Sequence, residues 1–420
     1  MKGRLCVLAA GCAMLALSAA GRQEHTVANP DRRKSSSAPR PGVASTAPAK
    51  WAAVEAIKLK GLEVGLSQPV LVARRRGYLW FPTLTKLPDG RLMAQMSAYA
   101  DKHVKTTRSL VCWSDDGGLT WTKPVAGQYG EVALAIPSGD TLLLPYYLRR
   151  VGEDVLGAAY EVCPKGKREV RLTEPGVRVG GWPRPDRSFA PGLGLAGFVF
   201  NGQTVRLKGG GYLATLYGYF EGAKRYSLVA AESRDGVNWK VRSVVADEKC
   251  KLRGGEGPCE SAIARLKDGR IMCVFRLAGG APYGQTFSSD DGKSWTPPVA
   301  MRGPHSVQPS LAVMKDGTVA LSGGRPGLFL WINADGTGRS WQEVDVRRHH
   351  NARDDEKIVR HDHTSSYTEV VALDARHLLY IYDRIPRGWS AIPTGSNETN
   401  SVRVIRVTVK KPSSKAASRP

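Results

Sequence analysis

The chain has 420 residues, 42% of them hydrophobic, with 10 Trp, 14 Tyr and 46 Gly, which is enough for a large core with many turns between short strands. The formal charge of +23 favours anionic partners, namely acidic glycans, anionic lipid surfaces or nucleic acid. The sequence carries no nucleic-acid-binding motif, and no segment after the first twenty residues is long and apolar enough to span a membrane as a helix.

The first twenty residues predict a secretory signal peptide. Lys2 and Arg4 form a short basic start, residues 5–17 are apolar, and Ser18-Ala19-Ala20 offers small residues for cleavage. An alternative is a lipoprotein signal that ends at Cys12, although the apolar stretch before this cysteine is very short. We therefore expect an exported protein, periplasmic or secreted, with a lipid anchor at Cys12 as the alternative.

Composition divides the rest of the chain into three parts. Residues 21–50 are rich in Ser, Pro, Ala and basic side chains and predict a disordered linker, and residues 411–420 predict a disordered tail. Residues 51–410 predict one domain of short strands. Its five cysteines are an odd number and give no disulfide framework; Cys250 and Cys259 can close a loop, or all five can be isolated thiols.

Four segments within this domain share one turn motif, close to S-x-D-x-G-x-[ST]-W. In such a turn the Asp carboxylate accepts hydrogen bonds from nearby backbone N–H groups, Gly takes a positive φ, and the Trp ring packs between sheets. The first and third segments fit fully, the second is one residue shorter and the fourth one longer: Ser114–Trp121, Ser233–Trp239, Ser288–Trp295 and Asn333–Trp341.

A second element recurs between these turns. It consists of an apolar strand, a D-G turn and another apolar strand, which is a hairpin signature. Clear copies surround Asp89-Gly90, Asp268-Gly269 and Asp316-Gly317, and weaker copies complete six units. Six units of about four strands each predict an all-β protein, a six-bladed β-propeller of four-stranded antiparallel blades.

The four turns resemble the Asp boxes of the sialidase (neuraminidase) superfamily, also called BNR repeats. This resemblance covers most of the domain and implies the propeller fold rather than a chemistry, because similar boxes occur in propellers that are not enzymes. Sialidases use a Tyr nucleophile, because the carboxylate on the anomeric carbon of sialic acid repels an anionic Asp or Glu. A Glu accepts the phenol proton, an Asp acts as acid and base, and arginines bind the substrate carboxylate.

The resemblance assigns the first two residues by spacing. In sialidases the catalytic Glu starts a strand, a D-G turn follows about eight positions on, and a carboxylate-binding Arg ends the next strand about sixteen positions on. Here Glu260 is followed by Asp268-Gly269 and then by Arg276. The alternative for Glu260 is a solvated loop carboxylate, whereas an Arg that ends an apolar strand needs a partner or a ligand.

Three further residues follow from the same resemblance. Arg325, in Gly323-Gly324-Arg325-Pro326, takes the place of another carboxylate-binding Arg, and Tyr367, ahead of Val370-Val371, takes the place of the nucleophile. Asp101, thirteen residues before Ser114, takes the place of the acid/base residue. Tyr367 can instead pack a strand, and Asp101 can be an ordinary loop residue.

One departure from the family concerns the first Arg of the carboxylate-binding triad. Sialidases usually start the first blade with Arg-Ile-Pro, whereas this chain has Trp80-Phe81-Pro82. Loss of one such interaction costs about 1.5–3 kcal/mol, or one to two decades in affinity. Trp80 can stack on a sugar ring, or it can be a core residue.

Metal chemistry has little support in the sequence. His361 and His363 alternate along one face if the segment is a strand, but no third ligand is visible, so we expect neither a metal site nor a cofactor.

The leading hypothesis is an exported exo-glycosidase that removes a terminal acidic sugar, sialic acid first, with retention through a glycosyl-tyrosine. The alternatives are a glycan-binding propeller without turnover and a hydrolase for a non-sialic sugar.

Overall fold

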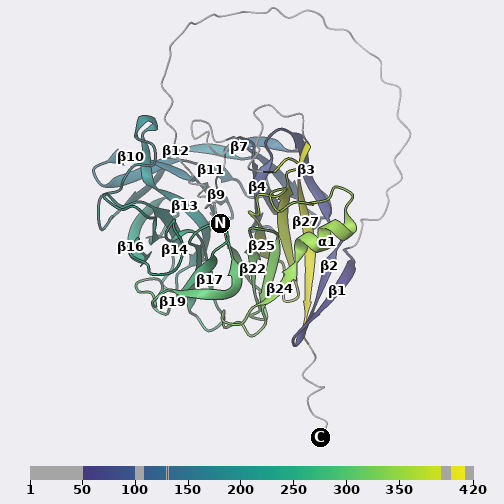
Figure 1. Cartoon of the computed structure of the whole chain (residues 1–420). Helices are drawn as coiled ribbons and strands as arrows, with labels where there is room; N and C mark the ends of the chain where they lie inside the picture. Colours follow the sequence, from purple (N-terminus) through teal and green to yellow (C-terminus); the bar gives the residue numbers. More distant parts are fainter. Residues whose placement is uncertain (1–50, 100–107, 129, 131, 389–398, 412–420) are drawn as a thin grey trace, which may run out of the picture. The chain divides into compact units, whose positions relative to one another are not determined.

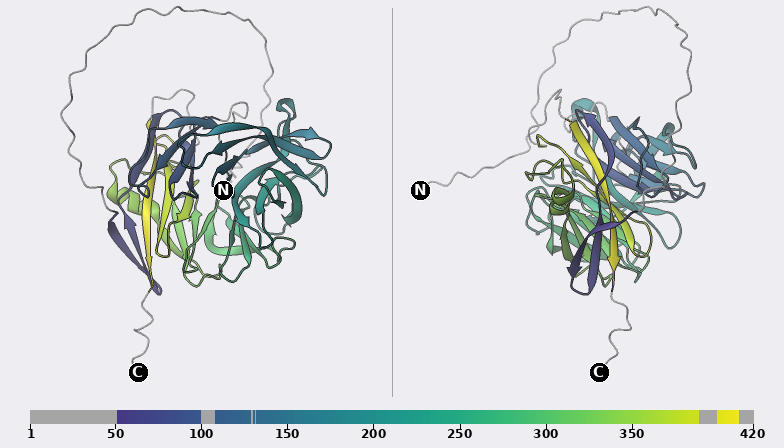
Figure 2. Two further views of the ribbon diagram at one scale, coloured as in Figure 1. Left: turned by 180° about the vertical axis from the view of Figure 1, so that it is seen from behind. Right: turned by 90° about the vertical axis from the view of Figure 1, so that its right-hand side faces the viewer.

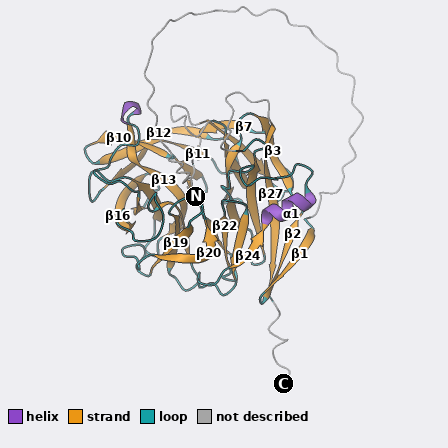
Figure 3. Cartoon of the chain, viewed as in Figure 1, coloured by secondary structure: helices purple, strands orange, loops and turns teal. Residues whose placement is uncertain are grey.

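The computed structural model describes residues 51–99, 108–128, 130, 132–388 and 399–411. The chain divides into two units, Met1–Pro48 and Ala49–Pro420, and every described residue belongs to the second. The predicted signal peptide, the linker, Cys12 and Asp101 therefore lie outside the described residues. Strands dominate the described part of the chain, as Figure 3 shows.

Three sheets are antiparallel meanders of four strands each. They recur along the chain at the places where the hairpin pattern predicts strands (Figure 1). Their strands are β4 (Trp80–Lys86), β5 (Leu92–Ser97), β6 (Arg108–Ser114) and β7 (Val125–Gln128); β17 (Cys259–Arg265), β18 (Ile271–Arg276), β19 (Pro282–Ser288) and β20 (Val299–His305); and β21 (Ser310–Val313), β22 (Val319–Gly323), β23 (Phe329–Asn333) and β24 (Gln342–Asp345).

A fourth sheet joins the two ends of the domain. Strand β3, near the N-terminal end of the domain, pairs antiparallel with the C-terminal strand β27. Strands from both ends of the domain therefore share one sheet. An additional hairpin, β1–β2, extends the sheet beyond β27, and Figure 2 shows these segments side by side in both views. The strands are β1 (Ala53–Leu59), β2 (Leu62–Ser67), β3 (Val70–Arg76), β25 (Glu369–Ala372), β26 (His377–Arg384) and β27 (Thr399–Lys410).

The fifth sheet has nine strands and differs from the prediction of separate four-stranded blades. It contains two antiparallel runs, β8-β9-β11-β12 and β13-β14-β15-β16, which are joined because β12 pairs in parallel with β16 and β10 pairs with both β11 and β13. Seven of its strands consequently form a closed ring. The strands are β8 (Val132–Ala135), β9 (Thr141–Leu144), β10 (Tyr147–Gly152), β11 (Val155–Cys163), β12 (Arg171–Gly180), β13 (Leu195–Arg206), β14 (Tyr212–Gly218), β15 (Ser227–Ser233) and β16 (Asn238–Ala246).

Two short helical elements complete the described structure, a 3₁₀ turn at Pro191–Leu193 and the helix α1 (Val346–Arg353). The Asp345 side chain caps α1 by accepting a hydrogen bond from the backbone N–H of Arg348 at 2.9 Å. The core consists of apolar layers between neighbouring sheets. One layer, for example, packs Leu84 and Ala94 of the β4–β7 sheet against Ile381 of β26.

The four S-x-D-x-G-type turns connect the third and fourth strands of their units and have similar hydrogen bonds. In the second, Ser233 Oγ donates to Asp235 Oδ1 at 2.9 Å, and Gly236 N donates to Ser233 Oγ at 2.8 Å. The indole N–H of Trp239 donates to Gly236 O at 2.9 Å. Gly236 has a φ of +82°, and an added Cβ would lie 2.6 Å from Leu134 Cδ2, so this position requires glycine.

The first strands of successive units lie next to one another. β8 contacts β13, β13 contacts β17, β17 contacts β21, β21 contacts β25, and β25 contacts β4. Residues at the starts of β17, β21 and β25 consequently approach each other although they are far apart in the sequence. This arrangement positions the candidate site.

Candidate functional site

Glu260 is the second residue of β17, and its carboxylate is almost fully buried, with 9% of the side chain exposed. Three neighbours donate hydrogen bonds to it. Arg276 Nη1 lies 2.8 and 2.9 Å from the two carboxylate oxygens, the backbone N–H of Gln308 lies 2.9 Å from Oε2, and the Tyr367 phenol donates to Oε1. The carboxylate therefore has partners from three segments of the chain.

Tyr367 lies two residues before the start of β25, in a loop that is held by the buried carboxylate of Asp383 on β26. Asp383 Oδ1 accepts hydrogen bonds from Thr364 Oγ1 at 2.8 Å and from Ser365 N at 2.7 Å, and Oδ2 accepts one from Ser365 Oγ. Ser366 has a φ of +62°, a conformation that is uncommon for residues other than glycine. These contacts fix the backbone that directs the phenol toward Glu260.

Arg276 ends β18 and lies beside Glu260 because the antiparallel register pairs Cys259 with Arg276. Its Nη1 also lies 3.1 Å from the Tyr367 hydroxyl, and its Nη2 donates to Glu256 Oε1 at 2.9 Å. The guanidinium thus contacts two carboxylates and the phenol.

The protonation states of the three groups depend on one another. Burial alone would raise the pKa of Glu260, but the charge of Arg276 and the hydrogen bonds that the carboxylate accepts outweigh burial and hold the pKa below its usual 4.5. Burial, and then the negative charge of Glu260, raise the pKa of Tyr367 well above 10. Burial opposes the charge of Arg276, yet the negative charges beside it, that of the Glu260 carboxylate first, outweigh burial and raise the pKa of Arg276 well above its usual value. At neutral pH the site holds a carboxylate, a guanidinium and a neutral phenol.

Arg325 lies in the loop between β22 and β23 and faces the same tyrosine. Its Nη2 donates to Ser365 O at 2.5 Å, and its guanidinium carbon lies 5.6 Å from the centre of the Tyr367 ring. The structure therefore brings four of the predicted residues together: Glu260, Arg276, Arg325 and Tyr367.

Trp80, the first residue of β4, is 2% exposed, and its indole N–H donates to Tyr99 O at 3.0 Å. Its ring stacks on Phe81 at a centroid distance of 4.3 Å, and Phe81 in turn contacts the Tyr367 ring edge-on at 4.7 Å. The aromatic residue of this pair that lines the pocket is Phe81, whereas Trp80 packs behind it. Of the two alternatives for Trp80, stacking on a sugar ring or packing in the core, its burial therefore favours the core.

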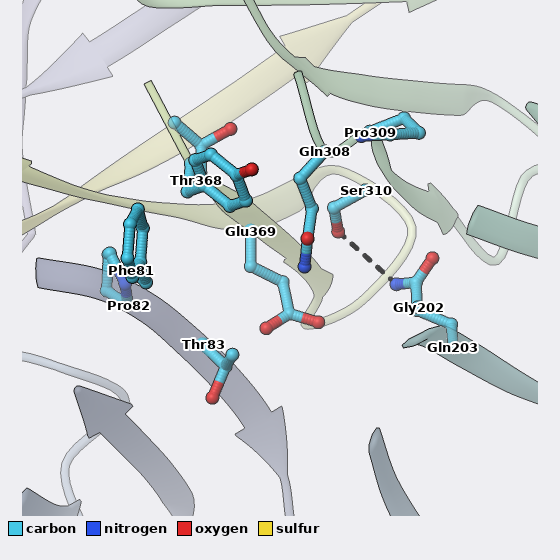
Figure 4. Close-up of a pocket in the computed structure, with 11 residues that line it drawn as sticks. Phe81, Pro82, Thr83, Gly202, Gln203, Gln308, Pro309, Ser310, Thr368 and Glu369 are labelled. Carbon is cyan, nitrogen blue, oxygen red and sulfur yellow. Dashed lines mark hydrogen bonds between the residues drawn. The ribbon is translucent and has the colours of Figure 1, made fainter. Parts of the chain in front are cut away.

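A pocket opens beside Tyr367, between the first strands of four units (Figure 4). Among the residues that line it, Glu369 is charged, and its carboxylate accepts a hydrogen bond from Leu84 N at 2.6 Å. The others are neutral side chains or glycine. The lining consists of Phe81, Pro82, Thr83, Gly202, Gln203, Gln308, Pro309, Ser310, Tyr367, Thr368 and Glu369.

Sequence reasoning missed several residues of the site. Glu256 lies four positions before Glu260 in a loop rich in Gly and Pro, and only its spacing from Glu260 could have indicated it. Asp383 ends an apolar strand, where a lone carboxylate needs partners, and this was the available signal. Asp101, the predicted acid/base residue, lies outside the described residues.

The remaining predictions concern cysteines, metals and membranes. The five cysteines of the described residues, Cys250 and Cys259 included, are free thiols. Among the described residues, no three His, Cys, Asp or Glu side chains are grouped so that they could hold a metal ion. Within the same ranges, no helix has the length and hydrophobicity needed to cross a membrane.

No protein-family model and no curated protein matches this sequence. Among solved structures, the fold is similar to a protein of unknown function from Dyadobacter fermentans, with a TM-score of 0.62 and 19% identity over 84% of this chain and 100% of that one. It is also similar to the α-L-arabinanase of Penicillium chrysogenum complexed with arabinobiose (TM-score 0.53, 16% identity, 81% and 98% of the two chains). A third similar structure is the Hadza microbial sialidase Hz136 (TM-score 0.52, 13% identity, 81% and 66%). At identities this low the structural likeness shows the fold alone, so the chain has a fold similar to that of the arabinanase and of the sialidase.

Proposed function

We propose that this protein is a glycoside hydrolase that releases a terminal sugar with retention of configuration, with Tyr367 as nucleophile. The observation that carries the proposal is the hydrogen bond from the Tyr367 phenol to the buried carboxylate of Glu260. A nucleophile that is held by a base, with the base itself fixed by further donors, is the arrangement that covalent catalysis requires. The fold alone carries no such conclusion.

The chemistry has two steps. Glu260 accepts the phenol proton as the Tyr367 oxygen attacks the anomeric carbon, and the bond from that carbon to the leaving oxygen breaks. An acid protonates the leaving oxygen, which completes a glycosyl-tyrosine. In the second step water attacks the same carbon and its proton passes to the base, while the bond from that carbon to the Tyr367 oxygen breaks and the phenolate recovers its proton from Glu260. We propose Asp101 as the acid and base of the two steps.

Arg276 supports this chemistry in two ways. Its charge keeps Glu260 ionised while the phenol is neutral, so the acceptor is ready before substrate arrives. Its Nη1, 3.1 Å from the phenol oxygen, also stabilises the negative charge that develops on Tyr367 during attack.

We propose a terminal acidic sugar as substrate, sialic acid first, because a phenol is neutral where a carboxylate nucleophile would be repelled. Arg276 and Arg325 would bind its carboxylate. A neutral sugar is the second candidate, since Trp80 stands in the sequence where sialidases have the first Arg, and the pocket is lined by Phe81 and has Glu369 as its charged side chain. A third candidate is a propeller that binds glycan without turnover.

The proposal extends to architecture and location. We propose that the six four-stranded runs are the blades of one β-propeller, in which the sheet β25-β26-β27-β3 joins the chain ends. The four S-x-D-x-G-type turns would then be Asp boxes. The predicted signal peptide implies an exported protein that meets glycans outside the cytoplasm, with the lipid anchor at Cys12 as the alternative.

The test is release of a fluorescent aglycone from aryl glycosides, one an α-sialoside and one an α-L-arabinofuranoside. We expect turnover of at least one by wild type and none by Tyr367→Phe. No turnover by wild type together with measurable binding of free sialic acid would favour the glycan-binding alternative. Undiminished turnover by Tyr367→Phe would exclude the proposed nucleophile.

A further inference from the structure

Arg276 binds two carboxylates that differ in how firmly they are held. Glu260 accepts hydrogen bonds from Arg276, from Tyr367 and from the backbone of Gln308, and its side chain is 9% exposed. The side chain of Glu256 is 38% exposed; among the described residues its ion pair is with Nη2 of the same guanidinium, at 2.9 Å, and its Oε2 accepts a weak hydrogen bond from Cys259 Sγ at 3.9 Å. Glu260 is therefore fixed, whereas the carboxylate of Glu256 can exchange Arg276 for water.

The backbone that carries Glu256 is anchored, so an exchange involves its side chain alone. Glu256 N donates to Leu277 O at 3.1 Å, and Glu256 O accepts from Tyr226 N at 2.8 Å. Arg225, the residue before Tyr226, donates to three backbone carbonyls of the loop that carries Glu256, those of Glu248, Cys250 and Gly254, at 2.8 to 3.2 Å. Rotation of the Glu256 side chain therefore leaves the loop in place.

We propose that Glu256 is a specificity-determining residue that occupies the position on Arg276 where the carboxylate of an acidic substrate binds. This inference rests on the proposed function. A guanidinium binds a carboxylate through parallel N–H groups, and Nη1 of Arg276 is already used by Glu260 and Tyr367. Nε has no hydrogen-bond partner among the described residues, but it is buried. Nη2 is therefore the accessible position for a substrate carboxylate, and Glu256 fills it in the free protein.

The residue that occupies Nη2 of Arg276 in the free protein is an anion, so a substrate carboxylate can replace it by exchange of one carboxylate for another. Arg276 is 13% exposed, and a buried guanidinium that loses a partner carries a large energetic penalty. With Glu256 in place Nη2 has a charged partner without substrate, and an acidic sugar replaces Glu256 without leaving this N–H group unpaired. A neutral sugar offers no such replacement, so Glu256 stays on Arg276 when a neutral sugar binds.

The inference predicts that Glu256→Gln binds acidic sugars more tightly. For a fluorogenic aryl α-sialoside we expect KM to fall about five- to tenfold relative to wild type, while kcat changes by less than about twofold. The change in KM is of this size because the substrate gains a charged hydrogen bond, but one that is weakened by the partial exposure of Glu256 to solvent. Binding of free sialic acid, measured by calorimetry in a Tyr367→Phe background, gives the same comparison without turnover.

Glu248→Gln is the matched control. Glu248 lies on the same loop, but it pairs with Arg184 at 3.0 Å and accepts from Ser227 Oγ at 2.8 Å instead of binding Arg276. If Glu256→Gln lowered KM only by loosening the loop, Glu248→Gln would lower KM as well. We expect its KM to stay at the wild-type value, and melting temperatures confirm that both variants fold.

The outcomes separate this inference from the proposed function. An unchanged or raised KM and Kd in folded Glu256→Gln would overturn the inference while turnover by wild type upholds the function. Tighter binding of sialic acid by Glu256→Gln with no turnover by any variant would uphold the inference and overturn the function. No binding of sialic acid by either protein would overturn the inference.

Discussion

Tyr367 and Glu260 are 107 positions apart in the sequence, yet the phenol of Tyr367 donates a hydrogen bond to the Glu260 carboxylate. The two residues meet because β17, β21 and β25 lie in succession, with Glu260 near the start of β17 and Tyr367 just before β25. Arg276 contacts both, so the site brings together the proposed nucleophile, its proposed proton acceptor and a cation that holds the acceptor ionised.

Removal of the phenol should abolish turnover without unfolding the protein. In Tyr367→Phe, Glu260 keeps its hydrogen bonds with Arg276 and with Gln308 N, so the carboxylate stays paired. We expect kcat to fall at least about 10³-fold, as for other nucleophile removals, with little change in melting temperature. Tyr380→Phe is the matched control because Tyr380 is a buried tyrosine that packs against Tyr382 in an apolar cluster. Its kcat should be close to that of wild type.

The ionisation of Glu260 should couple stability to pH. Its pKa in the folded protein lies below 4.5, so its contribution to stability is present above pH 4.5 and is lost as pH falls through the lower folded value. We expect Glu260→Gln to lower the free energy of unfolding at pH 7 by about 2–4 kcal/mol, because Arg276 loses a buried partner. Denaturant unfolding of both proteins at pH 7 and pH 3 measures this difference. A larger difference in unfolding free energy between the two proteins at pH 3 than at pH 7 would contradict a lowered pKa of Glu260.

Asp383 should act as a positioning residue for Tyr367. Its carboxylate accepts four hydrogen bonds, including one from the backbone N–H of Phe81 at 3.1 Å, and its side chain is buried. Asn in its place cannot accept all of them, so Asp383→Asn should lose about 1–3 kcal/mol of unfolding free energy.

The kinetics separate positioning from simple destabilisation. Because the nucleophile is displaced, we expect kcat of Asp383→Asn to fall about 10- to 100-fold at a temperature where the protein is fully folded, with KM changed less. Asp355→Asn, at an exposed loop position, should alter neither stability nor kcat. A kcat for folded Asp383→Asn equal to that of wild type would limit Asp383 to a structural role.

The S-x-D-x-G-type turns should contribute to stability in a pH-dependent way. Burial opposes the charge of Asp235, but hydrogen bonds from the side chain and backbone of Asn238 outweigh it and lower the pKa from 3.8 to about 2. Its contribution is therefore present above pH 3.8 and lost as pH falls through about 2. Because Asp235 is exposed, we expect Asp235→Asn to lower the unfolding free energy at pH 6 by about 1 kcal/mol. Thermal unfolding at pH 6 and pH 2 tests whether the difference disappears in acid.

The sequence predicted those features of the fold that depend on local turns. Hairpins around Asp268-Gly269 and Asp316-Gly317 connect β17 to β18 and β21 to β22 in the structure. The parallel pairing of β12 with β16 could not be predicted, because it depends on contact between strands that no turn connects. The helix Val346–Arg353 was also missed, since its capping residue Asp345 was the one clear signal and little of the helix is apolar.

The residues of the candidate site likewise differ in how far the sequence could predict them. The resemblance to sialidases indicated Glu260 and Arg276 by their spacing, and in the structure one hairpin register places them side by side. Their contact with Tyr367 depends on the order of the sheets, which spacing within one unit does not encode, and only the resemblance to sialidases suggested it. Glu256 and Asp383 act through side-chain contacts across loops, for which the sequence carries only weak signals: the spacing of Glu256 from Glu260 and the lone carboxylate of Asp383 in an apolar strand.

The central claim is that Tyr367 becomes covalently bonded to the sugar. The most direct measurement is mass spectrometry of the protein after reaction with fluorinated glycosyl fluorides, a sialosyl and an arabinofuranosyl one, because fluorine slows breakdown of the glycosyl-enzyme. We predict one added sugar on the peptide that contains Tyr367, and none on Tyr367→Phe. A sugar attached to a Glu or Asp, or an unlabelled protein that still turns over a glycoside, would contradict the account.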